Sequence, residues 1–256
     1  MEFLNQMNQE LQFIFLVLLG LVCGSFISLL SYRLVFKSPI FIARSKCPEC
    51  KTILKIKNLI PLFSWIFQRG KCSNCQKKIS WRYPLIEFFT SCGFVVTFIF
   101  LGGKFDIKLL IYLAILMVLI TMIIIDLEHY FIPDILQIIL GFLAMTLVIY
   151  NGGLSAIYKG ILPSILYVGF GLAVWMFFYF SAGIDGIGID DFKFFLIAGF
   201  MLGVNNFLLF MFLSGIIGAI FGAIWQRIKN DETFPFAPAI CLSAYICLLV
   251  GRPVIY

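Results

Sequence analysis

Charged side chains are scarce in this sequence: Asp, Glu, Lys and Arg make up 12% of the 256 residues, whereas 62% of the residues are hydrophobic. Ordinary soluble domains contain roughly 25% charged and 45 to 50% apolar residues, so the composition excludes a typical soluble protein. Apolar runs of about 20 residues, the length of a membrane span, recur along the chain with short polar breaks. A chain of 29.1 kDa built mostly from such runs leaves no room for a large soluble domain.

Signal-peptide features and histidines are also scarce. The first apolar run, residues 11–30, lacks a basic leader and a cleavage site of small residues, and more apolar runs follow it. Secretory signal peptides carry both features, so we expect a retained helix.

The single histidine, His129, lies beside acidic residues at a predicted membrane edge. Such a histidine is more typical of an interfacial residue than of a metal ligand, although its titration range leaves a catalytic role open.

Acidic residues are almost absent between Arg33 and Arg82, where Glu49 stands alone among many lysines and arginines. Positively charged loops remain on the cytoplasmic side of a membrane, so we predict that this segment is cytoplasmic. The same charge can indicate nucleic-acid binding, but beside a membrane span attraction to anionic lipid headgroups is the simpler explanation. We therefore expect the lipid bilayer as a partner, and no nucleic acid.

The apolar runs predict an all-α polytopic membrane protein with about eight transmembrane helices. The predicted spans are residues 11–32, 85–102, 109–125, 135–150, 160–182, 194–204, 207–225 and 237–251. With the basic loop inside, alternation places both termini outside and Lys193, Arg227 and Lys229 inside, in agreement with the positive-inside rule. The sixth span is short, and Asn205 and Asn206 can mark a turn within the membrane instead of a full crossing.

Two short breaks, residues 126–134 and 183–193, are acidic on a face that favours positive charge. Asp126 follows an unbroken apolar run, which leaves it at or just inside the hydrocarbon boundary, where an ionisable group costs about 2.5 to 3.5 kcal/mol. It is therefore a functional candidate, with a helix-end carboxylate at the interface as the alternative. Asp190 and Asp191 follow a glycine-rich turn, and helix capping is their alternative role.

The possible pairing of these acids favours a catalytic role. Two carboxylates within hydrogen-bond reach do not both ionise easily, so one keeps a proton while the other acts as a base. Such a pair activates water against an amide without a metal or a covalent intermediate. The glycines beside the second acid let the backbone of an extended substrate approach. Their spacing and their position after a membrane span, not after a strand, exclude a dinucleotide-binding loop.

Two Cys-x-x-Cys pairs lie within the basic segment. They are formed by Cys47, Cys50, Cys72 and Cys75. Four thiolates at this spacing can close a tetrahedral zinc site, and a loop this short gains much of its folding energy from the metal. Disulfides are the alternative, but they rarely persist in a reducing cytoplasm. We predict a small zinc-binding cytoplasmic loop domain. The remaining cysteines are predicted to be small buried hydrophobic residues: Cys23, Cys92, Cys241 and Cys247.

The chain resembles the bacterial type IV prepilin leader peptidases over nearly its full length. The matching stretches are residues 20–34, 47–50, 58–65, 70–75, 82–87, 126–134, 188–193 and 234–238. The resemblance implies a polytopic GxGD-type aspartyl protease that removes a short basic leader after a glycine. Many members of the family also methylate the new N-terminus with S-adenosylmethionine, so the resemblance implies this second activity as well.

The resemblance places the first catalytic aspartate at Asp126 and the second at Asp191, because the family's Gly-Asp-x-Lys is matched through Asp191 and Lys193. This chain has Asp190 where the family has glycine, and Ala237 where the family usually has glycine. The extra carboxylate of Asp190 either raises the proton affinity of Asp191 or points away on a helix. No stretch identifies the residues that would bind S-adenosylmethionine.

We therefore expect a first span in residues 1–32, a tetracysteine zinc loop in residues 33–84 that resembles the family's methyltransferase part, and a peptidase bundle in residues 85–256. The expected function is cleavage of the leader from prepilin or pseudopilin precursors, with methylation of the product. The active site is expected to face the cytoplasm from the inner membrane. The alternatives are a peptidase without methyl transfer, an ion- or proton-coupled transporter, and a membrane-tethered zinc module that binds a partner.

Overall fold

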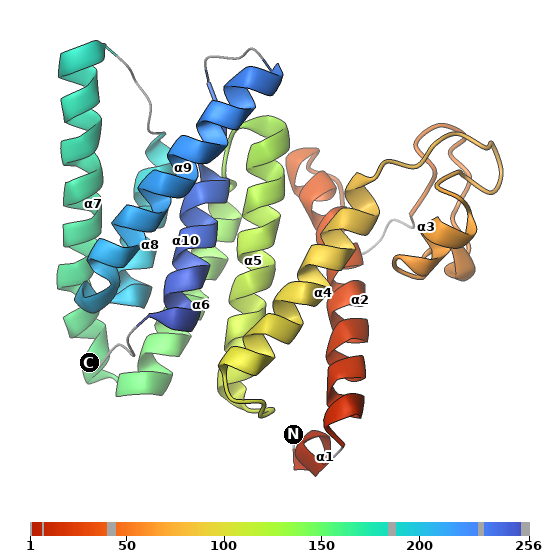
Figure 1. Ribbon diagram of the computed structural model, residues 1–256, viewed down its shortest axis with the longest axis horizontal. Coiled ribbons are helices and arrows are strands. Elements are labelled where there is room, and N and C mark those ends of the chain that lie inside the picture. Colours follow the sequence, from red (N-terminus) through yellow and green to blue (C-terminus); the bar gives the residue numbers. More distant parts are fainter. Residues whose placement is uncertain (1, 7, 40–44, 184–187, 230–232, 252–256) are drawn as a thin grey trace. The chain divides into compact units, whose positions relative to one another are not determined.

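The computed structural model describes residues 2–6, 8–39, 45–183, 188–229 and 233–251 (Figure 1). Within these ranges the regular elements are helices, together with two isolated antiparallel bridges. The chain forms two compact units, Met1–Asp106 and Ile107–Tyr256, which are described separately below.

The first unit is built on two long helices that pack against each other, α2 (Gln9–Val35) and α4 (Arg82–Phe100). Glycines of α2 allow the close approach: a Cβ atom at Gly20 would lie 2.5 Å from the Cα atom of Ser91, and one at Gly24 would lie 2.6 Å from the Cα atom of Glu87. Small residues let membrane helices approach closely and gain van der Waals contact. The shorter elements of this unit are α1 (Glu2–Gln6), η1 (Ile56–Asn58) and α3 (Phe63–Phe67).

The second unit contains the other six α-helices of the described residues. They are α5 (Ile107–His129), α6 (Asp134–Gly152), α7 (Ser155–Ala182), α8 (Ile189–Leu202), α9 (Phe207–Lys229) and α10 (Ala237–Val250). The most buried candidate span is α5, which packs against α6 and α10. Helix α8 packs against α6, α7 and α10, so the starts of α8 and α10 and the end of α5 belong to one packed set of helices.

Six helices among the described residues are long and apolar enough to cross a membrane: α2, α4, α5, α6, α7 and α9. Helices α8 and α10 have 14 residues each. At about 1.5 Å per residue they are shorter than a hydrocarbon core of about 30 Å. The chain is thus a multi-pass, all-α membrane protein, and each of the eight predicted spans overlaps a helix.

The predicted sixth span, residues 194–204, is displaced from the helix that forms there. Helix α8 already begins at Ile189, so it includes the charged residues that the apolar pattern left outside the span. Carboxylates are favourable in a first helical turn because they face the positive end of the helix dipole. The helix ends at Leu202, and Gly203, with a φ of 69°, leads into the short 3-10 helix η2 (Val204–Asn206) before α9. The structure thus has a turn at Asn205 and Asn206, and its position within the membrane stays a prediction.

Candidate active site

Asp126 lies in the last turns of α5 with 5% of its surface exposed. Its Oδ2 atom accepts a hydrogen bond of 2.8 Å from the main-chain N–H of Ala237, the first residue of α10. The first N–H groups of a helix lack partners within the helix, and they favour a negative charge. The start of α10 therefore orients Asp126. Sequence reasoning missed this contact, although the segment Phe234–Pro238 was one of the stretches that carried the resemblance.

Asp191 lies in the first turn of α8 and has 8% of its surface exposed. Its Oδ2 atom accepts a hydrogen bond of 3.0 Å from the main-chain N–H of Gly188, the residue that caps the helix. In return, the N–H of Asp191 donates to the carbonyl oxygen of Gly188 at 3.1 Å. The carboxylate of Asp191 thus satisfies the N–H of the residue that caps the helix, as the third helical residue does in one half of a capping box, and this contact restrains the carboxylate within α8.

The structure brings the two predicted acids into one site. The carboxylates of Asp126 and Asp191 interact electrostatically, and the thiol of Cys241, which is fully buried on α10, interacts with both. Helices α5, α8 and α10 thus each contribute one ionisable group to a buried cluster. A pair of carboxylates in such an environment can share one proton, so that one acts as an acid and the other as a base.

The third acid, Asp190, turns its side chain toward the surface. Its Oδ1 atom lies 3.0 Å from Nζ of Lys193, which also lies 2.6 Å from Oδ1 of Asp134. Adjacent residues on a helix do not share a face, so Asp190 points away from the buried pair. Its charge remains within electrostatic range of both Asp126 and Asp191. The glycine-rich break before α8 is only partly seen, because Asp185 and Gly186 lie outside the described residues.

The four predicted zinc ligands are also brought together. The Sγ atoms of Cys47, Cys50, Cys72 and Cys75 all lie within 4.8 Å of one another. The Sγ atoms of Cys47 and Cys75 are 3.9 Å apart. Zn–S bonds of about 2.3 Å in a tetrahedron separate the sulfur atoms by about 3.8 Å, so the geometry fits a four-thiolate zinc site. These cysteines are free in the structure and form no disulfide.

The two Cys-x-x-Cys pairs lie on two turns built in the same way. In the first turn the N–H of Lys51 donates to the carbonyl oxygen of Cys47, and in the second the N–H of Gln76 donates to that of Cys72, both at 3.0 Å. Lys51 and Gln76 both have a φ of 57°. An antiparallel bridge closes each turn, Lys46 with Ile53 in the first and Lys71 with Lys78 in the second.

Hydrogen bonds at these turns favour the thiolate form, which metal binding requires, at two of the four cysteines. Contacts with Thr52 and Asn74 lower the pKa of Cys50 to about 6. Main-chain N–H groups of Cys75 and Asn74 lower the pKa of the Cys72 thiol. At Cys75 a main-chain hydrogen bond from Lys77 lowers the pKa, but desolvation and the hydrogen bonds with Cys50, Cys72 and Cys47 outweigh it and raise this pKa to about 11. The hydrogen bonds of the turns thus favour the thiolate at Cys50 and Cys72, and a bound cation would have to displace the proton of Cys75.

The prediction for the other cysteines was correct for Cys241 and Cys247, which are buried, but wrong for Cys92, which is exposed on α4. Cys23 is only partly buried. An apolar run shows that a residue lies in a membrane helix, but it does not tell which side of the helix faces the protein and which faces lipid.

A polar contact in the first unit was not expected from the sequence. Glu87, buried on α4, accepts a hydrogen bond of 2.7 Å from the main-chain N–H of Leu62, and also one from the side chain of Ser25. Nearby, the guanidinium group of Arg82 donates to the hydroxyl of Ser31 at 2.7 Å. The bond from Leu62 fastens the segment before α3 to α4, and the bonds from Ser25 and Arg82 link α4 to α2. In the sequence, the signal that could have pointed to these contacts is the presence of two charged residues, Arg82 and Glu87, at the edge of an apolar run.

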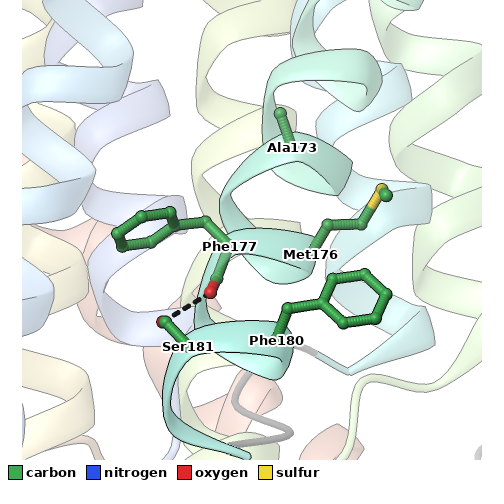
Figure 2. A pocket seen from close by; sticks show the side chains of 5 residues that line it. All are labelled: Ala173, Met176, Phe177, Phe180 and Ser181. Carbon is green, nitrogen blue, oxygen red and sulfur yellow. Dashed lines mark hydrogen bonds between the residues drawn. The ribbon is translucent and has the colours of Figure 1, made fainter.

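A surface pocket on α7 does not belong to this chemistry. Figure 2 shows that its lining side chains all come from this one helix: Ala173, Met176, Phe177, Phe180 and Ser181. The Ser181 hydroxyl donates to the carbonyl oxygen of Phe177, which satisfies the one polar side chain of the set. No lining residue is titratable, and the exposed phenylalanines suit contact with lipid.

In comparisons with known proteins, each compact unit matches a protein-family model. The model of the bacterial peptidase A24 N-terminal domain matches residues 18–101, and the model of the type IV leader peptidase family matches residues 113–223. The chain is 34% identical to a prepilin leader peptidase/N-methyltransferase of Bacillus subtilis (strain 168), over 94% of this chain and 95% of that protein. No solved structure gives a significant match.

Two further relatives carry the same name. The protein of Stutzerimonas stutzeri is 30% identical over 92% of this chain and 89% of its own length. The protein of Legionella pneumophila is 32% identical over 86% of this chain and 76% of its own length.

Proposed function

The chain belongs to the type IV leader peptidase family, and we propose that it is a prepilin peptidase that removes the basic leader from type IV prepilin or pseudopilin precursors and then methylates the new N-terminus. The observation that carries the peptidase activity is the buried pair of carboxylates, Asp126 and Asp191, each held by a main-chain N–H group. The names of the relatives, prepilin leader peptidase/N-methyltransferase, support the substrate class and the methyl transfer.

In the proposed mechanism the ionised member of the pair takes a proton from a water molecule, which attacks the carbonyl carbon of the leader's last glycine. The protonated member donates a hydrogen bond to the carbonyl oxygen and stabilises the negative charge that develops there. Collapse of the tetrahedral intermediate breaks the C–N bond, and a proton passes to the departing amine. The products are a leader with a free carboxylate and a pilin with a free α-amino group.

The contacts with Ala237 and Gly188 prepare the pair for these steps. Each occupies one carboxylate oxygen, Oδ2 in both residues, and we assign the other oxygen, Oδ1, to water and substrate. Because both donors are main-chain groups at the start of a helix, the carboxylates are held without a charged partner that would neutralise them. The substrate has to be extended at the cleaved bond, since a helix hides its carbonyl groups in hydrogen bonds.

We place this end of the second unit at the cytoplasmic face of the inner membrane. The last turn of α9 carries Arg227 and Lys229, and positive charge is retained on that face. The indole N–H of Trp225, also near the end of α9, donates to the hydroxyl of Tyr130, which follows α5. This contact places the positive end of α9 beside the end of α5 that carries Asp126.

We further propose that Cys47, Cys50, Cys72 and Cys75 bind one structural zinc ion, which would stabilise the loop by cross-linking its two turns. The methyl donor implied by the resemblance is S-adenosylmethionine, and we assign methyl transfer to residues 33–84, which contain this loop.

The test uses purified protein in detergent with a precursor that carries a basic leader, a glycine at the cleavage site and an apolar helix. Mass spectrometry of the products measures both activities: release of the leader and addition of a methyl group in the presence of S-adenosylmethionine. We expect both. Leader release without methylation would limit the function to a peptidase, and no release at all would contradict it.

A further inference from the structure

Gln137 is a buried polar residue near the start of α6, with 4% of its surface exposed. Its Nε2 atom donates a hydrogen bond of 2.8 Å to the main-chain carbonyl oxygen of Asp190 on α8. Its Oε1 atom is buried and has no hydrogen-bond partner among the described residues. A buried amide with an unpaired oxygen is unfavourable for packing, and an apolar side chain of similar size would avoid that penalty. Packing alone therefore does not explain why an amide side chain occupies this position.

A second contact joins the same two helix starts. Lys193 of α8 bridges Asp134 of α6 and Asp190. These side chains are 44%, 73% and 34% exposed, and ion pairs in such positions are screened and flexible. The hydrogen bond from Gln137 is sheltered and directed at the main chain, so it is the stronger restraint on the first turn of α8.

The carbonyl group that Gln137 holds belongs to the residue directly before Asp191. Successive residues of an α-helix differ in direction by about 100°, so a contact with α6 on one side fixes where the next side chain points. From this first turn Asp191 reaches the N–H of Gly188 and interacts with Asp126 of α5. Further along α8, the backbone packs against α7, where a Cβ atom at Gly199 would lie 2.7 Å from the carbonyl oxygen of Pro163.

We propose that Gln137 is a positioning residue for peptide cleavage: by holding the Asp190 carbonyl, it fixes the direction in which Asp191 presents its carboxylate to Asp126. The inference rests on the proposed peptidase function. Without the donor, the first turn of α8 keeps its internal contact between Gly188 and Asp191 and the exposed bridge through Lys193, but it loses its sheltered contact with α6. The turn as a whole can then shift while the rest of the helix stays packed against α7. Small displacements of a catalytic group slow catalysis strongly, because the reacting atoms no longer meet in the productive geometry.

The test compares Gln137→Met with Gln12→Met in the cleavage assay, at several precursor concentrations. Gln12 is a matched control because it is also buried and also donates from Nε2 to a main-chain carbonyl, that of Leu4 at 2.9 Å, but it lies on α2 in the other unit. For Gln137→Met we expect kcat to fall about ten- to a hundredfold. We expect KM within about twofold of the wild-type value and a thermal midpoint that is unchanged or higher. Gln12→Met is expected to keep the wild-type kcat.

Three outcomes would contradict the inference. Wild-type kcat in Gln137→Met, and in Gln137→Leu, which also lacks the donor, would show that the contact has no effect on catalysis. A loss of kcat matched by a lower thermal midpoint, or by an equal loss in Gln12→Met, would show a merely structural role. Wild-type protein that releases no leader would overturn the proposed function itself, and this inference with it.

Discussion

The main-chain N–H of Ala237 and the carboxylate of Asp126 form a hydrogen bond of 2.8 Å that links the start of α10 to the end of α5. The donor belongs to the backbone, so the methyl group of Ala237 takes no part in the bond. A substitution that keeps the N–H group should therefore keep the orientation of Asp126.

Ala237→Gly tests this expectation, because glycine retains the donor and is the residue that the family usually has here. The methyl group is almost fully buried, with 1% exposed, so its removal should cost only about 0.5 to 1 kcal/mol of stability. We expect leader release within about threefold of the wild-type rate, a change that corresponds to well under 1.4 kcal/mol in the barrier. A loss greater than about tenfold would mean that the side chain itself shapes the site.

The contact between α2 and α4 predicts different effects of adding a methyl group at two helical glycines. At Gly24 the new Cβ atom would lie 2.6 Å from the Cα atom of Glu87, whereas at Gly141 on α6 no atom lies within 4 Å. We expect Gly24→Ala to destabilise the protein by about 1 to 3 kcal/mol through overpacking. Gly141→Ala should be neutral or slightly stabilising, because alanine favours helix. Thermal unfolding in detergent measures both, and equal midpoints would contradict the close approach of the helices.

The tetracysteine loop should hold about one zinc ion per chain. Cys72→Ser removes one ligand and should lower the zinc content and make the loop more sensitive to proteolysis, because the metal cross-links its two turns. Cys92→Ser is the matched control, since Cys92 is an exposed cysteine on α4 away from the cluster. Elemental analysis of protein purified without chelator measures the zinc content per chain. Wild-type protein without metal, or with intact disulfides by mass spectrometry, would overturn the zinc proposal.

Much of this fold is readable from sequence because its signals are local. A membrane span requires a long apolar run, and a four-thiolate site requires closely spaced cysteines, so the helices and the tetracysteine cluster were predicted. Asp126 and Asp191 stood out because acids are costly beside such runs. Their catalytic roles remain predictions. The contacts made by Ala237 and Gln137 depend on residues distant in sequence, and a main-chain donor leaves no mark in the side-chain pattern.

The two proposed activities should be separable by mutation, because the cysteines and the carboxylates lie in different compact units. Asp126→Asn should give no methylated product from intact precursor, since no free N-terminus forms, but should methylate a pilin supplied already trimmed. The double variant Cys47→Ser, Cys50→Ser should lose methyl transfer more than cleavage, because the loop's shape depends on its metal. Transfer of labelled methyl groups to trimmed pilin, beside leader release from precursor, measures both. Equal loss of both activities in each variant would contradict the assignment of methyl transfer to residues 33–84.

The most direct measurement of the central claim is the rate of leader release by Asp126→Asn, Asp191→Asn and the matched control Asp190→Asn. An amide in place of either buried carboxylate removes the titratable proton on which a two-carboxylate mechanism depends. The partly exposed side chain of Asp190 instead pairs with Lys193, so its loss should matter little. We predict no detectable release by the first two variants, near wild-type release by the third, and normal membrane insertion of all three. Substantial release by Asp126→Asn or Asp191→Asn, or an inactive Asp190→Asn beside an active Asp191→Asn, would contradict this account.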